Sequence, residues 1–372
     1  MGLDKLFSGK NKVTNLIDTV SRKNKIAKAV VTITGMSMAS VVGAMALYNS
    51  FFQRYERPDY SLKPGIYCYE RAKDIVEREE FFFPANDVNL KGYYYPAQNS
   101  SGLVVVSHGL HAGADDYLPL IIYMVQNGFS VFAYDGRGTY DSEGSSTVGM
   151  CQALVDLNCT LGYIQKNDKY KDMPLLLLGH SCGGYAATSV LSLKKNIKAC
   201  AAIASPNNCY TLIREKGYQY GGLLASEGLP RIFLDAYQYI LFGNYTECDG
   251  VKGINSVNIP VLVAHGVDDK VISFDGQSII SHKKEITNQN VRYYIGTNDS
   301  GGHDSIWHSS AATEYKKAVE NSIAQLKEQK GDNLNDEEIA KFYKTIDHQK
   351  YSEINFALFD EIISMYKDAL NK

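Results

Sequence analysis

A serine within a tight, glycine-rich turn is the first residue of this chain whose surroundings suggest chemistry. The segment Gly179-His180-Ser181-Cys182-Gly183 fits the pattern G-x-S-x-G, in which small neighbours allow a strained turn to lift the serine hydroxyl clear of the backbone. The pattern follows the apolar run PLLLL and precedes the helix-like stretch GYAATSVLSL. This strand–turn–helix setting predicts that Ser181 is a nucleophile rather than an idle serine in a turn.

A serine hydroxyl is a weak nucleophile, so the chain must also supply a base and a carboxylate that orients the base. His303 lies in the glycine-rich loop GTNDSGGHD, directly after the apolar run RYYIG. A loop at the carboxyl end of a strand reaches the same sheet edge as the serine turn, so His303 is the predicted base. His308 is the alternative, because His282 lies in a lysine-rich helical stretch and His348 lies close to the C-terminus.

The predicted acid follows another apolar run, IPVLVAHG, which ends in Val267-Asp268-Asp269. Two adjacent carboxylates point in different directions, so only one of them can reach the histidine. The spacing Gly266-x-x-Asp269 favours Asp269 as the acid. Asp268 is expected to be a turn or capping residue instead.

An acyl intermediate also needs backbone donors for its negative charge. The N–H of Cys182 is one predicted donor, and the N–H of Leu110, in the loop after LVVVS, is the other. Of the two histidines in that loop, His108 and His111, one is expected to pack beneath it and the other to face the mouth of the cleft. No metal site is predicted, because the chain has no H-E-x-x-H pair and its seven cysteines include no C-x-x-C pair.

The elements that must position these residues are short apolar runs that alternate with helical patterns. Such an alternation predicts an α/β fold with a mostly parallel sheet covered by helices on both faces. About 55 residues separate two of the runs, which exceeds ordinary loop lengths, so a helical cap is predicted at about 207–256. Before the first run, EEFFFPANDVNLKGYYYP predicts two strands around an Asn-Asp turn. The predicted strands cover 103–107, 131–134, 175–178, 199–204, 260–264 and 291–295, and the predicted helices lie near 117–126, 150–165, 185–193 and 312–327.

The region from Glu79 to Lys327 resembles the α/β-hydrolase superfamily, near its serine aminopeptidase and monoacylglycerol-lipase-like branch. The resemblance is carried, in order, by VVVSHGLHAG, YDGRGTYDSEG, LLLLGHSCGGYAA, VLVAHGVDDKVI and GGHDSIW. It implies the α/β-hydrolase fold and a triad of Ser181, Asp269 and His303. The segment starting at Asp135 is similar to the D-x-R-G turn of the family, although Tyr140 stands where the family usually has a second glycine.

The N-terminal part contains an uncharged run of 20 residues, Ala29 to Tyr48. A helix of this length spans about 30 Å, the thickness of the hydrocarbon core of a bilayer. Seven basic residues and two acidic ones precede it, so a transmembrane helix with a cytoplasmic N-terminus and an extracytoplasmic catalytic domain is predicted. The alternatives are a signal peptide cleaved near Ala46, which would leave a secreted protein, and a buried helix.

The predicted organisation has five parts. A basic cytoplasmic tail covers 1–28, the anchor 29–48, and a linker with a lead-in helix 49–78. The hydrolase domain with its cap covers 79–328, and a helical C-terminal appendage, whose last helix is expected to dock on another surface, covers 329–372.

These patterns predict a serine hydrolase that cleaves a carboxylic ester, or alternatively an amide, through an acyl-Ser181 intermediate without a cofactor. The partners expected are a small acyl substrate, with a lipid suggested by the anchor and the aromatic cap, and the membrane. The net charge of −3 gives no indication of nucleic-acid binding. A catalytically idle binding or scaffold protein and an acyltransferase that uses the same triad are the alternative functions.

Overall fold

The computed structural model describes residues 41–371, apart from 44, 47, 66, 67, 194, 214, 216–228, 332 and 333. The chain divides into two compact units. One contains Phe52–Glu215 and Gln238–Lys372, and the other contains Met1–Phe51 and Lys216–Tyr237. The sheet and all residues of the site described below belong to the first of these units.

An eight-stranded sheet forms the centre of this unit, with the strand order β1-β2-β4-β3-β5-β6-β7-β8. The strands from β3 to β8 are parallel, whereas β2 pairs antiparallel with both β1 and β4. The mostly parallel sheet predicted from the sequence is therefore correct. The strands are β1 (Glu79–Ala85), β2 (Val88–Tyr95), β3 (Leu103–Ser107), β4 (Ser130–Tyr134), β5 (Leu175–His180), β6 (Ile197–Ile203), β7 (Val261–Gly266) and β8 (Val291–Gly296).

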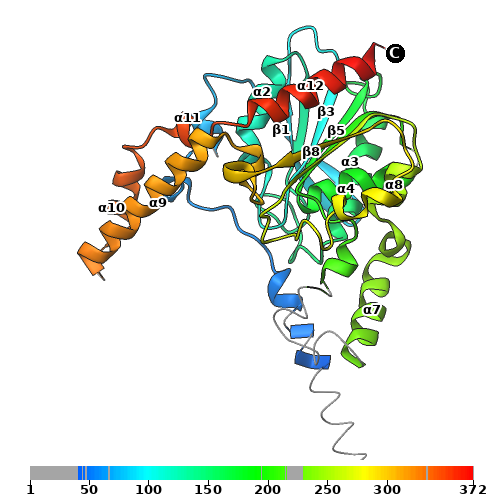
Figure 1. Ribbon diagram of the computed structural model, residues 1–372, viewed down its shortest axis with the longest axis horizontal. Coiled ribbons are helices and arrows are strands. Elements are labelled where there is room, and N and C mark those ends of the chain that lie inside the picture. Colours follow the sequence, from blue (N-terminus) through cyan, green and yellow to red (C-terminus); the bar gives the residue numbers. More distant parts are fainter. Residues whose placement is uncertain are drawn as a thin grey trace, which may run out of the picture. The chain divides into compact units, whose positions relative to one another are not determined.

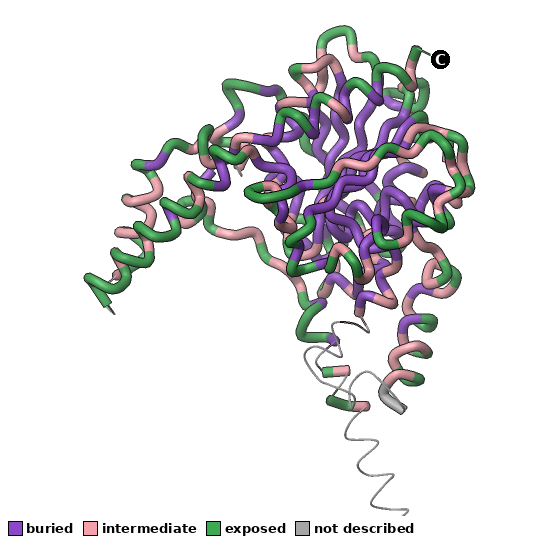
Figure 2. The backbone as a smooth tube through the Cα atoms, viewed as in Figure 1, coloured by how far each residue is buried: buried purple, intermediate pink, exposed green. Residues whose placement is uncertain are grey.

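The central strands form because their side chains are apolar on both sides. Every residue of β3, β4, β5 and β7 is buried, so these strands have continuous apolar runs instead of an alternating pattern. The buried residues gather in the sheet and in the helix surfaces that face it (Figure 2). The predicted hairpin between β1 and β2 is also present, and Asn86 adopts a positive φ in its turn, which asparagine tolerates well.

Helices cover the sheet on both faces (Figure 1). The α2 and α12 side chains pack with Val104, Val106, Leu176 and Leu178 in one apolar core, while α4 contacts β5 and β6 and also packs against α3 and α8. The α-helices are α2 (Leu118–Gln126), α3 (Gln152–Lys166), α4 (Cys182–Ser189), α7 (Leu229–Phe242), α8 (Gly250–Asn255), α9 (Ser310–Lys330), α10 (Asp336–Tyr343), α11 (His348–Tyr351) and α12 (Phe356–Leu370). Short 3-10 helices lie at Tyr60–Leu62, Tyr69–Arg71, Ala114–Tyr117, Val190–Leu193, Gly243–Glu247, Ile280–Glu285, Asn298–Ser300 and Ser305–Trp307.

The last helix of the predicted appendage, α12, docks on the sheet. Its apolar side chains, among them Leu358, Phe359 and Ile362, belong to the core, and the hydroxyl of Tyr366 donates a 2.6 Å hydrogen bond to the carbonyl of Leu177 in β5. The expectation that this helix docks on another surface is thus met by the sheet of the same unit.

The predicted tail lies outside the described residues, and the predicted anchor and cap lie partly outside them. The tail 1–28 and most of the predicted anchor 29–48 fall there, and no helix among the residues that the structure describes is long and apolar enough to cross a membrane. Within the predicted cap, α7 and α8 are described and residues 216–228 are not. The seven cysteines are all described, and all are free thiols.

Candidate active site

Ser181 lies in a sharp turn between a strand and a helix. β5 ends at His180 and α4 begins at Cys182, so the serine is the N-cap residue of the helix, with φ 55° and ψ −123°. A positive φ strains a residue that has a side chain, and such strain persists only where the surroundings hold it. The turn therefore has the strand–turn–helix form that the G-x-S-x-G pattern predicts.

Three glycines around this turn leave no room for side chains. A Cβ atom added to Gly179 would lie 2.2 Å from the carbonyl oxygen of Gly183, and one added to Gly183 would lie 2.0 Å from that of Ser107. At Gly184 the added atom would lie 1.7 Å from Oγ of Ser205. This close packing explains the glycines of the pattern, and it fixes the turn against the neighbouring strands.

The predicted acid and base are in direct contact. Nδ1 of His303 lies 2.7 Å from Oδ2 of Asp269, which is also 3.2 Å from Nε2 of His265. Oδ1 of Asp269 accepts 2.8 Å hydrogen bonds from the N–H groups of Val271 and Ile272. Burial alone would raise the pKa of Asp269, but the hydrogen bonds from His265 and His303 outweigh it and hold the pKa well below its usual value. An ionised carboxylate thus faces Nδ1 of His303, which leaves Nε2 for proton transfer.

Asp268 and His308, the alternative acid and the alternative base, make other contacts. Asp268 is exposed, and its backbone N–H donates a 2.8 Å hydrogen bond to the carbonyl of Gly301. Nδ1 of His308 lies 3.3 Å from the carbonyl oxygen of Glu353, and its ring packs on Trp307 with 3.8 Å between the centroids. Neither residue takes part in the acid–base contact.

The histidine loop returns to the turn that carries Ser181. Nε2 of His180 lies 3.2 Å from the carbonyl oxygen of His303, and the two imidazole centroids are 4.9 Å apart. Ser181 follows His180 directly and is 8% exposed, so its side chain is nearly enclosed. The structure therefore joins Asp269 and His303 directly, and it places the backbone of His303 against His180, the residue before Ser181.

The loop after β3 lies over the serine. A Cβ atom added to Gly109 would be 3.2 Å from Cβ of Ser181, and the N–H of Gly109 is already used in a 2.9 Å hydrogen bond to the hydroxyl of Tyr117. The next N–H, that of Leu110, is the donor predicted from the sequence. The N–H of Cys182 belongs to the first turn of α4, where backbone donors have no partner within the helix.

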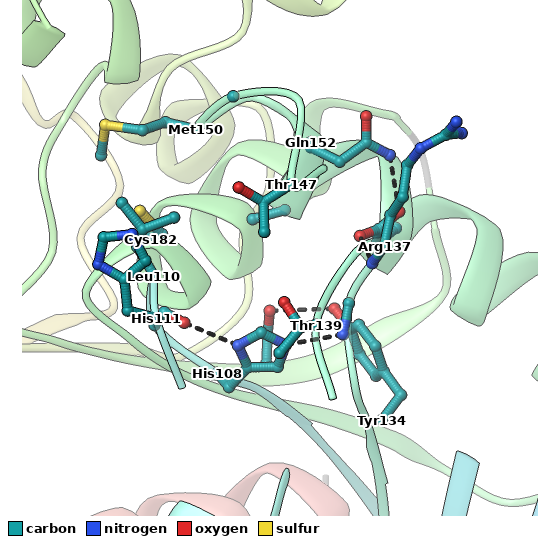
Figure 3. Close-up of a pocket in the computed structure, with 16 residues that line it drawn as sticks. His108, Leu110, His111, Tyr134, Arg137, Thr139, Thr147, Met150, Gln152 and Cys182 are labelled. Carbon is teal, nitrogen blue, oxygen red and sulfur yellow. Dashed lines mark hydrogen bonds between the residues drawn. The ribbon is translucent and has the colours of Figure 1, made fainter. Parts of the chain in front are cut away.

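Both predicted donor residues line one pocket (Figure 3). In the close-up, Leu110, His111, Cys182 and Met150 lie on one side of it, and Arg137 and Gln152 lie on the other. The lining also includes Ser107, His108, Gly109, Tyr134, Gly136, Thr139, Thr147, Gly149, Ala153 and Asp156. The pocket thus places apolar and hydroxyl-bearing side chains beside the two predicted donors.

The two histidines of the loop differ as expected. His108 lies beneath the loop, where its Nδ1 donates to the carbonyl of Gly109 at 2.7 Å and its Nε2 accepts from the N–H of Gly136 at 2.8 Å. Burial lowers the pKa of His108 to about 4, so the ring is neutral. His111 is exposed, with its ring centroid 5.4 Å from that of Tyr55.

A buried carboxylate, Asp135, supports the loop after β3 through a hydrogen bond. Its Oδ1 accepts the N–H of Ala114 at 2.8 Å, and its Oδ2 accepts the hydroxyl of Tyr93 at 2.8 Å and lies 3.3 Å from the guanidinium of Arg57. Arg57 also contacts Asp115 at 2.6 Å. Burial raises the pKa of Asp135 to about 7 in spite of these donors.

Tyr140, the departure from the family pattern, fits its surroundings. Its φ is 45°, its hydroxyl donates to Asp116 at 2.6 Å, and its ring stacks on Tyr55 with 5.7 Å between the centroids. A Cβ atom added to Gly113 would lie 2.2 Å from the Tyr140 ring. The tyrosine therefore fills the space beside Gly113 and holds the end of the loop in place.

Residues 52–57, which the sequence suggested only as part of a linker, run along the pocket wall. The N–H of Tyr55 donates to Gly138 at 2.9 Å and its carbonyl accepts from Tyr140 at 2.8 Å, while the N–H of Thr147 donates to Phe52 at 2.9 Å. Because Thr139 and Thr147 line the pocket, this segment supports the wall from outside.

Comparison with known proteins shows that the chain is similar to several hydrolases. A family model described as serine aminopeptidase, S33, matches residues 98–214. The lysophosphatidylserine lipase ABHD12 of Danio rerio is 28% identical over 226 residues, which cover 58% of this chain and 52% of that protein. An uncharacterized membrane protein of Saccharomyces cerevisiae, YNL320W, is 26% identical over 189 residues, which cover 50% of this chain and 60% of that protein. The chain thus spans about half of the lipase that it matches.

Among solved structures, the Pyrococcus furiosus esterase Pf2001 is 18% identical, covers 75% of this chain and 98% of its own, and superposes with a TM-score of 0.50. The protein has the α/β-hydrolase fold. Within this fold, Ser181, Asp269 and His303 follow β5, β7 and β8, in the order that the sequence motifs predict.

One group of side chains among the described residues has metal-ligand spacing. The ligand atoms of His180, His303 and Asp304 lie within 4.8 Å of one another. Both ring nitrogens of His180 are already hydrogen-bonded, however, to Tyr117 and to the carbonyl of His303. The arrangement therefore fits a hydrogen-bonded contact between loops better than a metal site.

Proposed function

We propose that this protein is a serine hydrolase that cleaves carboxylic esters, and alternatively amides, through an acyl-Ser181 intermediate. The observation that carries the proposal is the 2.7 Å contact between Asp269 and His303 beside the strained turn of Ser181. An orienting carboxylate, a base and a serine at a helix N-terminus are the three groups that nucleophilic acyl transfer requires.

In the proposed reaction, Nε2 of His303 takes the proton of Ser181 while Oγ attacks the substrate carbonyl. The N–H groups of Leu110 and Cys182 stabilise the oxyanion that develops. His303 then returns the proton to the leaving group, and the bond between the acyl carbon and the leaving atom breaks. Water attacks the acyl-serine with His303 as base, which releases the carboxylic acid and restores the hydroxyl.

Asp269 has two tasks in this scheme. Its low pKa keeps the carboxylate ionised, so it holds the proton of His303 on Nδ1 and stabilises the imidazolium that forms when Nε2 takes the serine proton. The N–H groups of Val271 and Ile272 fix the carboxylate itself.

We propose an acyl lipid as the substrate class. The name of the Danio rerio relative refers to a lysophospholipid, and α7, which lies in the segment predicted as a cap, carries several large apolar and aromatic side chains. The family model is named for an aminopeptidase, so an amide substrate is the competing possibility. A chain-length series of acyl esters compared with aminoacyl amides separates them: a preference for the amides over every ester contradicts the lipid proposal.

A fluorophosphonate probe tests the serine directly. We expect the native protein to be labelled and the Ser181→Ala variant to remain unlabelled. Ser192→Ala, which removes a hydroxyl that donates to the carbonyl of Ser189, is the matched control and should be labelled like the wild type. Failure to label the wild type, or undiminished labelling of Ser181→Ala, would rule out the proposal and favour an idle binding protein.

The same residues can transfer an acyl group to an acceptor other than water. Product analysis in the presence of alcohols or amines distinguishes the two reactions. An ester or amide product formed at the expense of free acid identifies an acyltransferase, and free acid alone identifies a hydrolase.

We also propose that residues 29–48 anchor the domain in a membrane, on the basis of their uncharged sequence and the basic residues before them. The full chain should remain with the membrane after alkaline extraction, and a chain that lacks 1–48 should not. An N-terminus that begins after Ala46 in the purified protein would instead identify a cleaved signal peptide.

A further inference from the structure

His180, the residue before the serine, connects three loops of the candidate site. Its Nδ1 lies 2.8 Å from the hydroxyl of Tyr117, and the same hydroxyl accepts the N–H of Gly109 at 2.9 Å. Its Nε2 lies 3.2 Å from the carbonyl oxygen of His303. One side chain in the serine turn thus contacts both the loop of the predicted oxyanion donor and the loop of the predicted base.

These contacts form a series of hydrogen bonds from the N–H of Gly109 to the carbonyl of His303. The groups at its two ends determine which atom donates in each bond. The N–H of Gly109 can only donate, so the Tyr117 oxygen accepts it and its hydroxyl proton is free to point at Nδ1 of His180. The carbonyl of His303 can only accept, so Nε2 of His180 must carry the proton. The opposite tautomer would set a nitrogen lone pair against a carbonyl oxygen, so only one arrangement satisfies every group.

The surroundings keep His180 neutral. His180 and Tyr117 are each 4% exposed, and the Tyr117 ring stacks on Trp307 with 5.9 Å between the centroids. Burial, reinforced by the nearby His303, lowers the pKa of His180 to about 4. A neutral ring is required here, because a second positive charge 4.9 Å from His303 would oppose formation of the imidazolium.

We propose that His180 is a positioning residue that joins the oxyanion loop, through Tyr117, to the backbone of the catalytic histidine. Its function is to hold the N–H of Leu110 and Nε2 of His303 in fixed positions around Ser181 while the acyl group is transferred. The proposal rests on the hydrolase function proposed above. Loss of either link should lower the rate of acylation without weakening substrate binding, because His180 itself is buried and does not reach the substrate.

Three substitutions of His180 separate its two links. His180→Asn keeps an oxygen that can accept from Tyr117 but is too short to reach His303. His180→Gln carries its amide N–H far enough to reach the His303 carbonyl but loses the acceptor for Tyr117. His180→Phe keeps the ring shape and loses both links.

We expect kcat to fall about 10-fold in His180→Asn and His180→Gln and about 100-fold in His180→Phe, with KM changed less than about threefold, since small displacements of catalytic groups cost factors of this size. If His180 positions the two loops, His180→Asn and His180→Gln should keep a higher kcat than His180→Phe, because each retains one of the two links. A merely structural role would lower the melting temperature of all three variants and leave the kcat of the folded protein unchanged.

Tyrosine substitutions supply a matched pair. Tyr117→Phe removes the middle of the hydrogen-bonded chain, and we expect kcat to fall about 10-fold. Tyr366→Phe removes an equally buried hydroxyl that bonds to a strand carbonyl outside the site, so it should lower the melting temperature with little change in kcat. In the double variant His180→Phe/Tyr117→Phe, kcat should equal that of His180→Phe, because both changes break the same chain.

Rates of fluorophosphonate labelling distinguish the failure of this proposal from the failure of the proposed function. An unlabelled wild type contradicts the hydrolase function itself. A labelled wild type together with His180→Asn and His180→Gln variants that label at the wild-type rate contradicts the positioning role alone. Additive losses in the Tyr117 double variant would also contradict it, and if the phenylalanine variant does not fold, the two polar variants and Tyr117→Phe decide the question.

Discussion

Two buried aspartates, Asp269 and Asp135, stand on opposite sides of the serine turn and behave in opposite ways. Asp269 follows β7 and Asp135 follows β4, and β5, which leads into Ser181, lies between these strands in the sheet. Each faces a basic side chain, His303 in one case and Arg57 in the other. The pKa of Asp269 is nevertheless held low, while that of Asp135 is raised to about 7.

The difference lies in the number and quality of the donors. Asp269 receives two backbone N–H groups and two histidines, with the shortest contact at 2.7 Å. Asp135 is fully buried and receives Arg57 only at 3.3 Å, because that guanidinium makes closer contacts with Asp115 and Asp141. A basic neighbour therefore does not by itself keep a buried carboxylate charged. Asp269 therefore stays ionised beside His303, whereas Asp135 holds the loop through the N–H of Ala114.

The same substitution at both aspartates gives the largest contrast. Asp269→Asn should lower kcat about 10³- to 10⁴-fold, because the amide stabilises the wrong tautomer of His303 and cannot balance the imidazolium. Asp135→Asn retains an oxygen that accepts the N–H of Ala114, so its kcat should stay within about 10-fold of the wild type. Steady-state kinetics on one ester measures both variants. Comparable losses of kcat in the two variants would mean that Asp135 takes part in catalysis.

Removal of Arg57 tests the supporting side of the comparison. Arg57→Met leaves Asp115 buried and short of one partner, so the free energy of unfolding should fall by about 3 kcal/mol. Arg137→Met is the control, since Arg137 pairs with the exposed Asp87 and its loss should cost less than about 1 kcal/mol. Urea unfolding measures both, and equal losses would show that the buried cluster contributes no more than a surface pair.

The pH dependence of stability distinguishes the two carboxylates in another way. The folded protein holds the Asp135 proton up to about pH 7, whereas the unfolded chain releases it near pH 4, so this group makes the free energy of unfolding decrease as pH rises from about 4 to 7. Asp135→Asn should remove a slope of at most about 1.4 kcal/mol per pH unit in that window. Urea midpoints at several pH values measure it, and an unchanged slope would assign the effect to another group.

The smallest effect is expected at Asp268, the neighbour of the acid. Its side chain is exposed, so Asp268→Asn should change kcat by less than about twofold. Comparison of Asp268→Asn with Asp269→Asn in the same assay tests whether only one of the two adjacent carboxylates orients His303. A loss at Asp268 as large as that at Asp269 would contradict the distinction.

Much of this arrangement could be predicted from the sequence, because the elements that carry it have strong local patterns. Buried parallel strands such as β3 are continuous apolar runs, and the predicted strands at 103–107 and 291–295 agree with β3 and with the less buried edge strand β8 to within one residue. Ser181, Asp269 and His303 each follow a predicted strand, so their common edge of the sheet could be inferred from order alone.

The supporting contacts could not be predicted in this way. Arg57, Tyr93, Asp115 and Asp135 come from four segments with no shared period, and only the folded chain brings them together. His180 carried no signal beyond its variable position in G-x-S-x-G. The pattern of α12 indicated an apolar face but not the surface that it covers.

The contact of residues 52–57 with the pocket wall has a consequence for local opening. The amide hydrogens of Tyr55, Tyr140 and Thr147 are bonded across the two segments, so exposing any of them to deuterium requires both segments to separate. These amides should therefore exchange as one cooperative group, and the pocket wall can loosen only when the chain that enters the domain detaches from it.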